Sequence, residues 1–290
     1  MFAGAMVAIV TPFKDGVVDE NALRGLVELQ IAGGTDAIIP CGTTGESATL
    51  SHKEHQLVVD IVIDAVAGRV PVIAGTGSNN TAEAIRLTQY ARDAGADGAL
   101  LITPYYNKPS QEGLYQHFKA VAESVDIPLV LYNVPSRTSV DMLAPTVARL
   151  ARLPNIVAIK EATGSMQRAS EIMAMCDPDF YLLSGDDFTF FPQMCVGGRG
   201  VISVTSNIAP ALIAGIYDAF AAGQWAEAAA GHHRLQKLCT AMFLETNPVP
   251  VKTALAMMGK VEDEIRLPLT LMASQTRSQL QQVLQEYELI

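Results

Sequence analysis

The residue whose setting most favours chemistry is Lys160, which directly follows the uninterrupted apolar run at residues 156–159. Such a run is typical of a strand buried on both faces, so we expect this amine where a strand leaves a core. Burial disfavours the ammonium form and lowers the pKa of a lysine, which makes its amine a nucleophile able to form a Schiff base with a carbonyl substrate. The alternative is a side chain that reaches water from the strand end or pairs with Glu161.

Residues 42–46, of sequence GTTGE, form a second candidate site after another short apolar run. Two glycines around two threonines favour a tight loop that can direct backbone N–H groups and the hydroxyls of Thr43 and Thr44 at an anion such as a carboxylate. A turn alone would explain the glycines. It would not explain two adjacent threonines before Glu46.

Two further apolar runs end in aromatic and basic residues. One is followed by Tyr105 and Tyr106, and the other ends in Tyr132 with Arg137 shortly after it. A phenol can pass protons, and a guanidinium offers a planar donor fork that suits a carboxylate. Singly, each tyrosine could be a packing residue and the arginine part of a surface ion pair. With an amine nucleophile they suit a 2-oxo acid, whose iminium serves as an electron sink for making or breaking a C–C bond.

Nothing in the sequence predicts a metal or a cofactor. Metal-dependent aldol chemistry needs clustered histidines and carboxylates, but the close histidine pairs, His52 with His55 and His232 with His233, have no evident further ligand at a strand end. The glycines at residues 74–77 do not fit the dinucleotide-binding pattern, and no P-loop pattern is present. We therefore expect a reaction carried by protein side chains alone.

Apolar strand patterns alternate with amphipathic helix patterns along most of the chain. This alternation predicts right-handed crossovers and a parallel sheet, and eight repeats indicate an α/β fold of the (β/α)8 TIM barrel class. We predict that residues 1–223 form the barrel with the active site and that 224–290 form a C-terminal helical extension. The expected strands are 2–10, 37–40, 71–74, 98–102, 128–132, 156–159, 180–183 and 200–203. The expected helices are 19–33, 51–66, 80–94, 110–125, 143–150, 166–175, 188–196 and 210–220, then 225–245, 252–258 and 274–288.

Composition limits the possible partners and compartment. The chain has 290 residues, 49% of them hydrophobic, and a formal net charge of −10. An acidic chain without a basic cluster is a poor match for nucleic acid. Four dispersed cysteines suggest reduced thiols. The apolar start lacks the basic residues and cleavage site of a secretion signal, and the longest later apolar stretch is too short to span a bilayer. We expect a cytoplasmic protein with small-molecule partners and no membrane segment.

In a barrel enzyme the active site lies at the carboxyl ends of the strands, where these candidate residues are expected. Their motifs closely resemble those of the dihydrodipicolinate synthase family. The resemblance covers nearly the whole chain, although the GTTGE loop and the lysine alone would also fit the wider group of class I pyruvate aldolases that includes N-acetylneuraminate lyase. The motifs lie at residues 42–46, 103–107, 132–138, 159–164, 183–187, 200–204 and 247–252.

The resemblance implies an enzyme, a lyase without a cofactor, that condenses pyruvate with L-aspartate 4-semialdehyde in the diaminopimelate route to lysine. Lys160 would form the Schiff base with pyruvate. Thr43, Tyr132 and Tyr106 would relay protons, with Tyr106 reaching into the site of a neighbouring subunit. The family is typically a homotetramer built as a dimer of dimers.

The resemblance also implies how the substrates are held. Thr44 would bind the carboxylate of pyruvate, while Gly185 and Ile202 would line the pocket through their backbones. Arg137 would bind the carboxylate of the second substrate and support Tyr132, which favours a small acidic substrate over sialic acid. After residue 138 the family often has glycine, whereas this chain has Ser139. A serine there would be strained if the position needs a positive φ.

Lysine inhibition is a further expectation from the resemblance. An alternative exists for part of this set, because residues 51–54 and 80–83 also fit helix-capping boxes. The residues matching the family's inhibitory lysine site are Ser47, Ala48, His52, His55, Asn79, Glu83 and Tyr105.

Two other functions stay open at this point. Another Schiff-base pyruvate aldolase or lyase, such as N-acetylneuraminate lyase, would share the barrel and Lys160 but turn over a different aldehyde. A non-catalytic barrel that binds a small acid would not need the lysine, which this chain keeps together with both threonines and both tyrosines.

Overall fold

The computed structural model describes residues 2–290, and these form two compact units. Unit 1 comprises residues 2–4 and 71–202, and unit 2 comprises residues 5–70 and 203–290. Each unit therefore draws on segments that are distant in the sequence. The division at residue 223 between a barrel and a helical extension stays a prediction.

Unit 1 contains a parallel sheet whose strands are hydrogen-bonded in the order in which they occur along the chain. A doubly wound sheet would reverse its strand order at a switch point, so this sequential order is the barrel arrangement. In the register, Lys160 stands beside Tyr132 on one side and Leu183 on the other. The strands are β5 (Ile73–Gly75), β6 (Gly98–Ile102), β7 (Leu129–Asn133), β8 (Ile156–Glu161), β9 (Tyr181–Ser184) and β10 (Gly200–Ser203).

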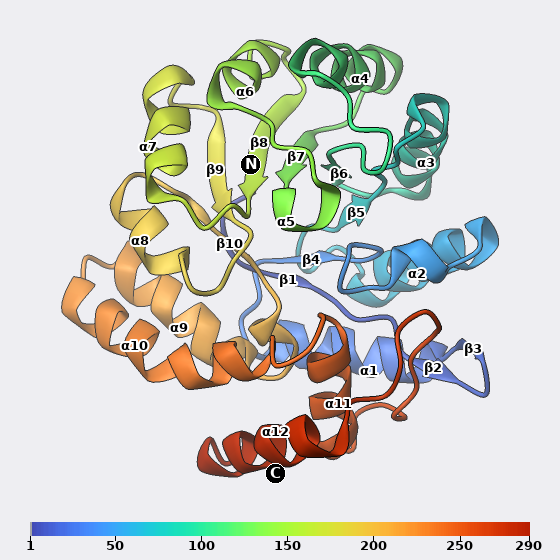
Figure 1. Cartoon of the computed structure of the whole chain (residues 1–290), viewed down its shortest axis with the longest axis vertical. Coiled ribbons are helices and arrows are strands. Elements are labelled where there is room, and N and C mark those ends of the chain that lie inside the picture. The colour runs from blue at the N-terminus through green and yellow to red at the C-terminus, as the bar shows by residue number, and fades with distance from the viewer. Residues whose placement is uncertain (1) are drawn as a thin grey trace. The chain divides into compact units, whose positions relative to one another are not determined.

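Helices follow these strands and pack against the sheet of unit 1 (Figure 1). Several begin at a polar residue whose side chain accepts a hydrogen bond from the first turn, namely Asn80, Ser110 and Ser165. Such caps satisfy N–H groups that have no partner within the helix. The helices are α3 (Thr81–Ala94), α4 (Gln111–Ser124), α5 (Pro135–Thr138), α6 (Ala144–Leu150), α7 (Met166–Met175) and α8 (Phe190–Cys195).

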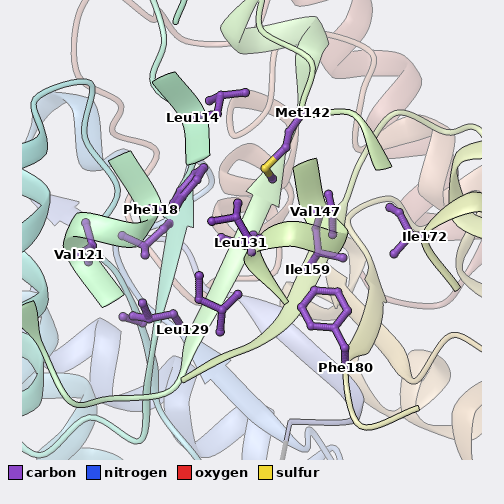
Figure 2. Packing of buried hydrophobic residues seen from close by; sticks show 14 of the residues in the cluster. Leu114, Phe118, Val121, Leu129, Leu131, Met142, Val147, Ile159, Ile172 and Phe180 are labelled. Atoms are coloured by element: carbon purple, nitrogen blue, oxygen red, sulfur yellow. The ribbon is translucent and has the colours of Figure 1, made fainter. Parts of the chain in front are cut away.

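The hydrophobic core of unit 1 lies between these strands and helices α4, α6 and α7 (Figure 2). Leu131 of β7 and Ile159 of β8 both belong to this core. Because successive strand residues point to opposite faces of a sheet, Tyr132 and Lys160 must point away from the helices. The packing of Leu131 and Ile159 thus fixes the direction of both functional side chains.

Unit 2 combines a parallel strand pair with most of the C-terminal helices. Strand β1 (Gly4–Ala8), whose first residue belongs to unit 1, pairs with β4 (Ala37–Ile39). A small antiparallel hairpin joins β2 (Phe13–Lys14) and β3 (Val17–Val18). The helices are α1 (Glu20–Ala32), α2 (His52–Val66), α9 (Pro210–Ala221), α10 (Trp225–Ala241), α11 (Val249–Met257) and α12 (Ser274–Glu286), with short 3₁₀ helices at Ser47–Thr49 and Thr205–Asn207.

The predicted (β/α)8 class is confirmed, since residues 2–290 contain eight parallel strands that alternate with helices. Some predicted boundaries were wrong. Strand β8 continues through Lys160 and Glu161, because buried partners accommodate both polar side chains. Helix α10 ends at Ala241, while α11 begins at Val249, since a proline is tolerated in the first turn of a helix.

Some short elements were not predicted. The hairpin of β2 and β3, helix α5 and the two 3₁₀ helices lie between the strands and helices that the sequence patterns indicate. All of them are too short to leave a periodic pattern in the sequence. Among residues 2–290 no helix has both the length and the apolar character needed to cross a membrane.

Phe118 tests the contribution of the unit 1 core. Its side chain is fully buried in that core, so Phe118→Ala should lower the free energy of unfolding by about 3–5 kcal/mol through lost burial and an unfilled cavity. Urea denaturation followed by circular dichroism would measure this. Met175→Ala, at an exposed position of α7, is the control and should change stability by less than about 1 kcal/mol. Equal effects of the two variants would contradict this account of the core.

Candidate active site

Lys160 is the centre of the candidate site in unit 1. It is the penultimate residue of β8, and only 5% of its surface is exposed. Its Nζ lies over the ring of Tyr132, 4.3 Å from the ring centroid. Tyr132 is itself buried near the end of β7, directly beside Lys160 in the sheet register. The structure therefore brings the predicted nucleophile and the predicted phenol together.

Gly185 leaves room for the lysine side chain. A Cβ atom at this position would lie 2.6 Å from the Cβ of Ala162 and 3.1 Å from both Cγ and Cε of Lys160. The contact with Ala162 is too short to be tolerated without a shift, and the contacts with Lys160 are tight enough that its side chain would have to yield by a few tenths of an ångström. Gly185 follows β9, so its lack of a side chain shapes the path of the amine. Ile202 is buried in β10.

Burial controls the charge of the amine. Loss of hydration lowers the pKa of Lys160 to about 7, the nearby positive charge of Arg137 also lowers it, and the negative charge of Asp187 partly opposes both. An ordinary lysine, with a pKa near 10.4, is only about 0.1% neutral at pH 7.4. A large share of the Lys160 side chains is therefore neutral and nucleophilic near physiological pH.

Glu161 lies next to Lys160 in sequence but belongs to a different set of contacts. It is fully buried, and its carboxylate accepts hydrogen bonds from Asn133 Nδ2 at 3.0 Å and from the backbone of Thr163 at 2.7 Å. Successive strand residues point to opposite faces, so this network lies on the helix side of the sheet. The structure therefore favours the buried nucleophile over the alternative in which Lys160 pairs with Glu161.

The same network ties the ends of β7 and β8 to the loops around them. Asn133 also donates to Asp141 at 2.9 Å and accepts from the backbone N–H of Met142 at 3.0 Å. Asp141 in turn accepts two hydrogen bonds from the guanidinium of Arg168. Such a network holds the two strand ends in one register, and with them Tyr132 and Lys160.

Asn133, Glu161 and Asp187 were not predicted as functional residues. Asn133 and Asp187 lie within the motifs at residues 132–138 and 183–187, and Glu161 directly follows the lysine. Asp187 is buried, and its negative charge acts on Lys160. A buried polar residue beside a nucleophile is the signal, but its burial becomes apparent only once the tertiary structure is known.

The remaining predicted residues of unit 1 lie in the loops. Arg137 belongs to helix α5, is exposed, and stands close enough for its charge to affect Lys160. Tyr106 is 90% exposed and has a left-handed φ of 71°. Such exposure of a large aromatic residue is compatible with a contact outside this chain.

Thr43 and Thr44 belong to unit 2, in the loop after β4. Thr44 is buried, and its hydroxyl accepts a hydrogen bond from Asn247 Nδ2 at 3.0 Å. Thr43 O accepts from the backbone N–H of Glu46, which closes the tight turn predicted for this loop. Hence both threonines follow the carboxyl end of a barrel strand, as the active-site rule requires.

The seven residues of the predicted lysine site fall in both units. In unit 1, Asn79 Nδ2 donates to the carbonyl of Tyr105 at 3.1 Å, and burial followed by the charge of Glu83 raises the pKa of Tyr105. Asn79 therefore contacts the backbone of Tyr105, while Glu83 lies close enough for its charge to act on the Tyr105 phenol. In unit 2, Ser47 and Ala48 lie in a 3₁₀ helix, while His52 and His55 lie in the first turn of α2.

The two possible capping boxes have different outcomes. Ser51 and Glu54 form a reciprocal box at the start of α2, as predicted. Asn80 caps α3 through its own side chain, but its N–H donates to Ser78 Oγ, and the Glu83 carboxylate accepts from that same hydroxyl at 2.5 Å. Glu83 is thus oriented by Ser78, not by a capping box with Asn80.

Within residues 2–290 the structure contains no group of three or more histidine, cysteine, aspartate or glutamate residues arranged to hold a metal ion. The groups placed around Lys160 are a neighbouring phenol, a glycine that makes room, and charges of both signs. Together with the fold, they define the class of (β/α)8 barrel proteins with a buried lysine on a strand.

Comparisons with known proteins agree with this class and narrow it. The model of the Dihydrodipicolinate synthetase family matches residues 1–287, so the chain belongs to that family. It is 60% identical to "4-hydroxy-tetrahydrodipicolinate synthase" of Syntrophus aciditrophicus (strain SB), over 100% of both chains. Two solved structures are very similar to this chain in fold. One is the chloride-inhibited dihydrodipicolinate synthase from Acinetobacter baumannii complexed with pyruvate, with a TM-score of 0.98, 48% identity and 100% coverage of both chains. The other is the enzyme from Cyanidioschyzon merolae with lysine bound, with a TM-score of 0.97, 42% identity and coverage of 100% of this chain and 99% of that one.

The charges around Lys160 predict how its pKa responds to substitution. Asp187→Asn should lower the pKa of Lys160 further, because it removes the charge that favours the ammonium form. Arg137→Leu should raise this pKa, because it removes a repelling cation. The pH dependence of Lys160 modification by an amine-reactive reagent, followed by peptide mass mapping, would report each midpoint. The wild-type rate should level off above about pH 8, whereas that of Nα-acetyl-lysine keeps rising to about pH 10.

Asp179→Asn is the control for these variants, since it removes an exposed carboxylate of the same unit. It should leave the midpoint of Lys160 unchanged. Shifts of Asp187→Asn and Arg137→Leu in the same direction would contradict the electrostatic account.

Proposed function

We propose that the protein is a pyruvate-dependent lyase that condenses pyruvate with L-aspartate 4-semialdehyde, in the diaminopimelate route to lysine. The observation that carries this proposal is the buried Lys160 amine, whose pKa is about 7, beside the phenol-bearing ring of Tyr132. Membership of the Dihydrodipicolinate synthetase family and a very similar structure complexed with pyruvate support the choice of substrates.

The reaction begins with the neutral amine of Lys160. Its lone pair attacks the ketone carbon of pyruvate, and loss of water leaves an iminium with a new C=N bond. Loss of a proton from the methyl carbon gives an enamine, because the iminium nitrogen takes up the electron pair. That carbon then attacks the aldehyde carbon of the second substrate and forms the new C–C bond, while the aldehyde oxygen takes up the π electrons and a proton. The amino group of the second substrate then adds to the C=N carbon, which closes the ring of the product and releases the Lys160 amine.

Each step moves protons, and we assign this task to Thr43, Tyr132 and Tyr106. Tyr132 is the best placed in unit 1, since its ring adjoins the amine. Thr43 follows the carboxyl end of β4, and Tyr106 would serve a neighbouring subunit, in keeping with its 90% exposure. Hydroxyl groups suit a relay, because each can donate and accept a proton.

The two carboxylates need donors of their own. We assign the carboxylate of pyruvate to Thr44, with Gly185 and Ile202 lining the pocket through their backbones. Arg137 would bind the carboxylate of L-aspartate 4-semialdehyde, since a guanidinium presents paired donors to such a group. Arg137 lies on α5, close enough for its charge to lower the pKa of Lys160, and this position supports the role. The pyruvate carbon bound through Lys160 and the carboxylate of the second substrate would then lie close together.

We further propose that the protein is cytoplasmic and works as a homotetramer built as a dimer of dimers. The support is its family membership, its dispersed cysteines and the exposure of Tyr106, which would complete the site of a partner subunit.

Borohydride trapping tests the central step. Reduction in the presence of pyruvate should attach a three-carbon acid to Lys160, and peptide mass mapping should find the adduct there. Lys160→Arg should abolish the adduct and reduce turnover by at least about 10³-fold, because a guanidinium cannot form the Schiff base. Lys260→Arg, at an exposed position, is the control and should leave both unchanged.

Other outcomes separate the alternatives. An adduct on another lysine, or none, would overturn the mechanism and favour a barrel that only binds a small acid. An adduct at Lys160 without turnover of L-aspartate 4-semialdehyde would indicate a different aldolase or lyase, such as N-acetylneuraminate lyase.

We also propose that L-lysine inhibits the enzyme through Ser47, Ala48, His52, His55, Asn79, Glu83 and Tyr105. A very similar structure with lysine bound supports this proposal. So does the local arrangement in unit 1, where Ser78 orients the Glu83 carboxylate near Tyr105. A carboxylate held in this way suits an ammonium group.

Steady-state rates at increasing lysine concentration test this regulation. The wild-type rate should fall at millimolar lysine, and Glu83→Gln should raise the half-inhibitory concentration roughly tenfold or more through loss of a charge-assisted hydrogen bond. Glu123→Gln removes an exposed carboxylate of α4 and should not change it. A wild-type rate insensitive to lysine would defeat the proposal.

A further inference from the structure

Residues 42–46, termed the threonine loop below, are held from several directions within unit 2. Thr11 Oγ1 donates to the carbonyl of Gly45 at 2.7 Å. A Cβ on Gly45 would lie 3.1 Å from the Cys41 backbone nitrogen and 3.2 Å from the carbonyl oxygen of Ile9, so the loop is packed closely against neighbouring backbone. Glu46 then takes a left-handed φ of 53°, a conformation that costs a non-glycine residue free energy. Something must stabilise Glu46 there.

The C-terminal part of the chain supplies that stabilisation. Lys252 of α11 places its Nζ 2.5 Å from Glu46 Oε1, and the side chain of each residue is only 2% exposed. The other carboxylate oxygen of Glu46 accepts from the backbone N–H of Arg266 at 3.3 Å. Lys252 Nζ also lies 4.2 Å from the ring centroid of Phe13, a favourable contact for a cation. The carboxylate therefore has partners on both oxygens.

A buried ion pair needs a reason beyond stability. Removing two charges from water costs several kcal/mol for each ion, and an apolar pair of the same size is often as stable or more so. The pair is, however, specific, because each charge is costly to bury without the other. Lys252 therefore holds Glu46, the last residue of the threonine loop, in one position.

A second contact orients a hydroxyl of the loop itself. Asn247, shortly before α11, donates from Nδ2 to Thr44 Oγ1 at 3.0 Å. The hydroxyl oxygen of Thr44 is thereby the acceptor, so its own proton stays available for donation. A carboxylate offers only acceptor oxygens and requires a donor of this kind. The hydrogen bond from Asn247 thus leaves the Thr44 hydroxyl to act as a donor to the substrate.

We propose that Asn247 and Lys252, from the C-terminal helical region, are positioning residues that hold the threonine loop for the carboxylate of the 2-oxo acid substrate. Lys252 sets the position of the loop through Glu46, and Asn247 sets the direction of the Thr44 hydroxyl. This inference rests on the proposed function, since it takes pyruvate as the ligand of the loop. It gives a part in substrate recognition to a region for which the apolar pattern predicts only a C-terminal helical extension.

Kinetics of the purified full-length enzyme test the role of the ion pair. Lys252→Met should raise the KM for pyruvate roughly tenfold or more and reduce kcat less, because the unpaired carboxylate of Glu46 would pull the loop toward water. Glu46→Gln combined with Lys252→Met should recover most of this loss, because no buried charge remains. Lys260→Met, an exposed lysine just beyond α11, should leave the KM unchanged.

Asn247→Asp provides a test that hardly changes volume. The carboxylate can only accept from Thr44, so the hydroxyl would turn toward it and would no longer donate to the substrate. The KM for pyruvate should rise roughly tenfold or more, while the KM for the aldehyde substrate should change by less than about twofold. Asn247→Ala should have a smaller effect, since the hydroxyl then stays free to rotate.

The outcomes separate a positioning role from a purely structural one. Variants that melt at lower temperature but keep the wild-type KM for pyruvate would overturn the inference and leave the pair as a structural contact. An equal rise in the KM of both substrates would overturn it as well. Failure of the proposed function looks different, because wild-type protein would then form no borohydride-trapped adduct with pyruvate.

Discussion

The burial of one amine is the constraint on which the rest of this structure depends. Loss of hydration is the main cause that lowers the pKa of Lys160 to about 7, so a large share of its amine is neutral near neutral pH. The lysine side chain lies beside the ring of Tyr132, and a Cβ at position 185 would collide with Ala162 and crowd the lysine. Tyr132 belongs to β7, Lys160 to β8, and Gly185 directly follows β9, so the surroundings of the amine depend on the parallel sheet.

Because side chains alternate between the two faces of the sheet, the candidate catalytic residues lie on one face and the residues that pack against the helices lie on the other. On one face of β7 and β8 stand Tyr132 and Lys160, while Leu131 and Ile159 on the other face pack into the helical layer. At the strand ends the support becomes polar, because Asn133 and Glu161 bond to each other and to the surrounding loops. A shift of one residue in either strand would exchange the two faces, so packing and chemistry select the same register.

Backbone strain gathers in the loops that follow the strands. Non-glycine residues with positive φ include Cys41 and Glu46 after β4, Tyr106 after β6, and Ser139 after helix α5. Ser139 has a φ of 56° where the family often has glycine, which meets the condition for strain stated from the sequence. Such conformations persist where surrounding contacts over-determine them. At Glu46 those contacts come from Lys252 and Arg266, which lie more than 200 residues further along the chain.

The sequence by itself determined the fold class and most element boundaries to within a few residues, because alternating apolar patterns are local properties. It also singled out Lys160, Tyr132, Arg137 and the threonine loop as candidates, since strand-end positions and motifs are read from neighbouring residues in the chain. Only the tertiary structure decided that Asp187 is buried near Lys160, that Asn133 and Glu161 are buried on the opposite face of the sheet, and that Asn247 and Lys252 contact the threonine loop. Burial and pairing arise between segments distant in sequence, so no local pattern encodes them.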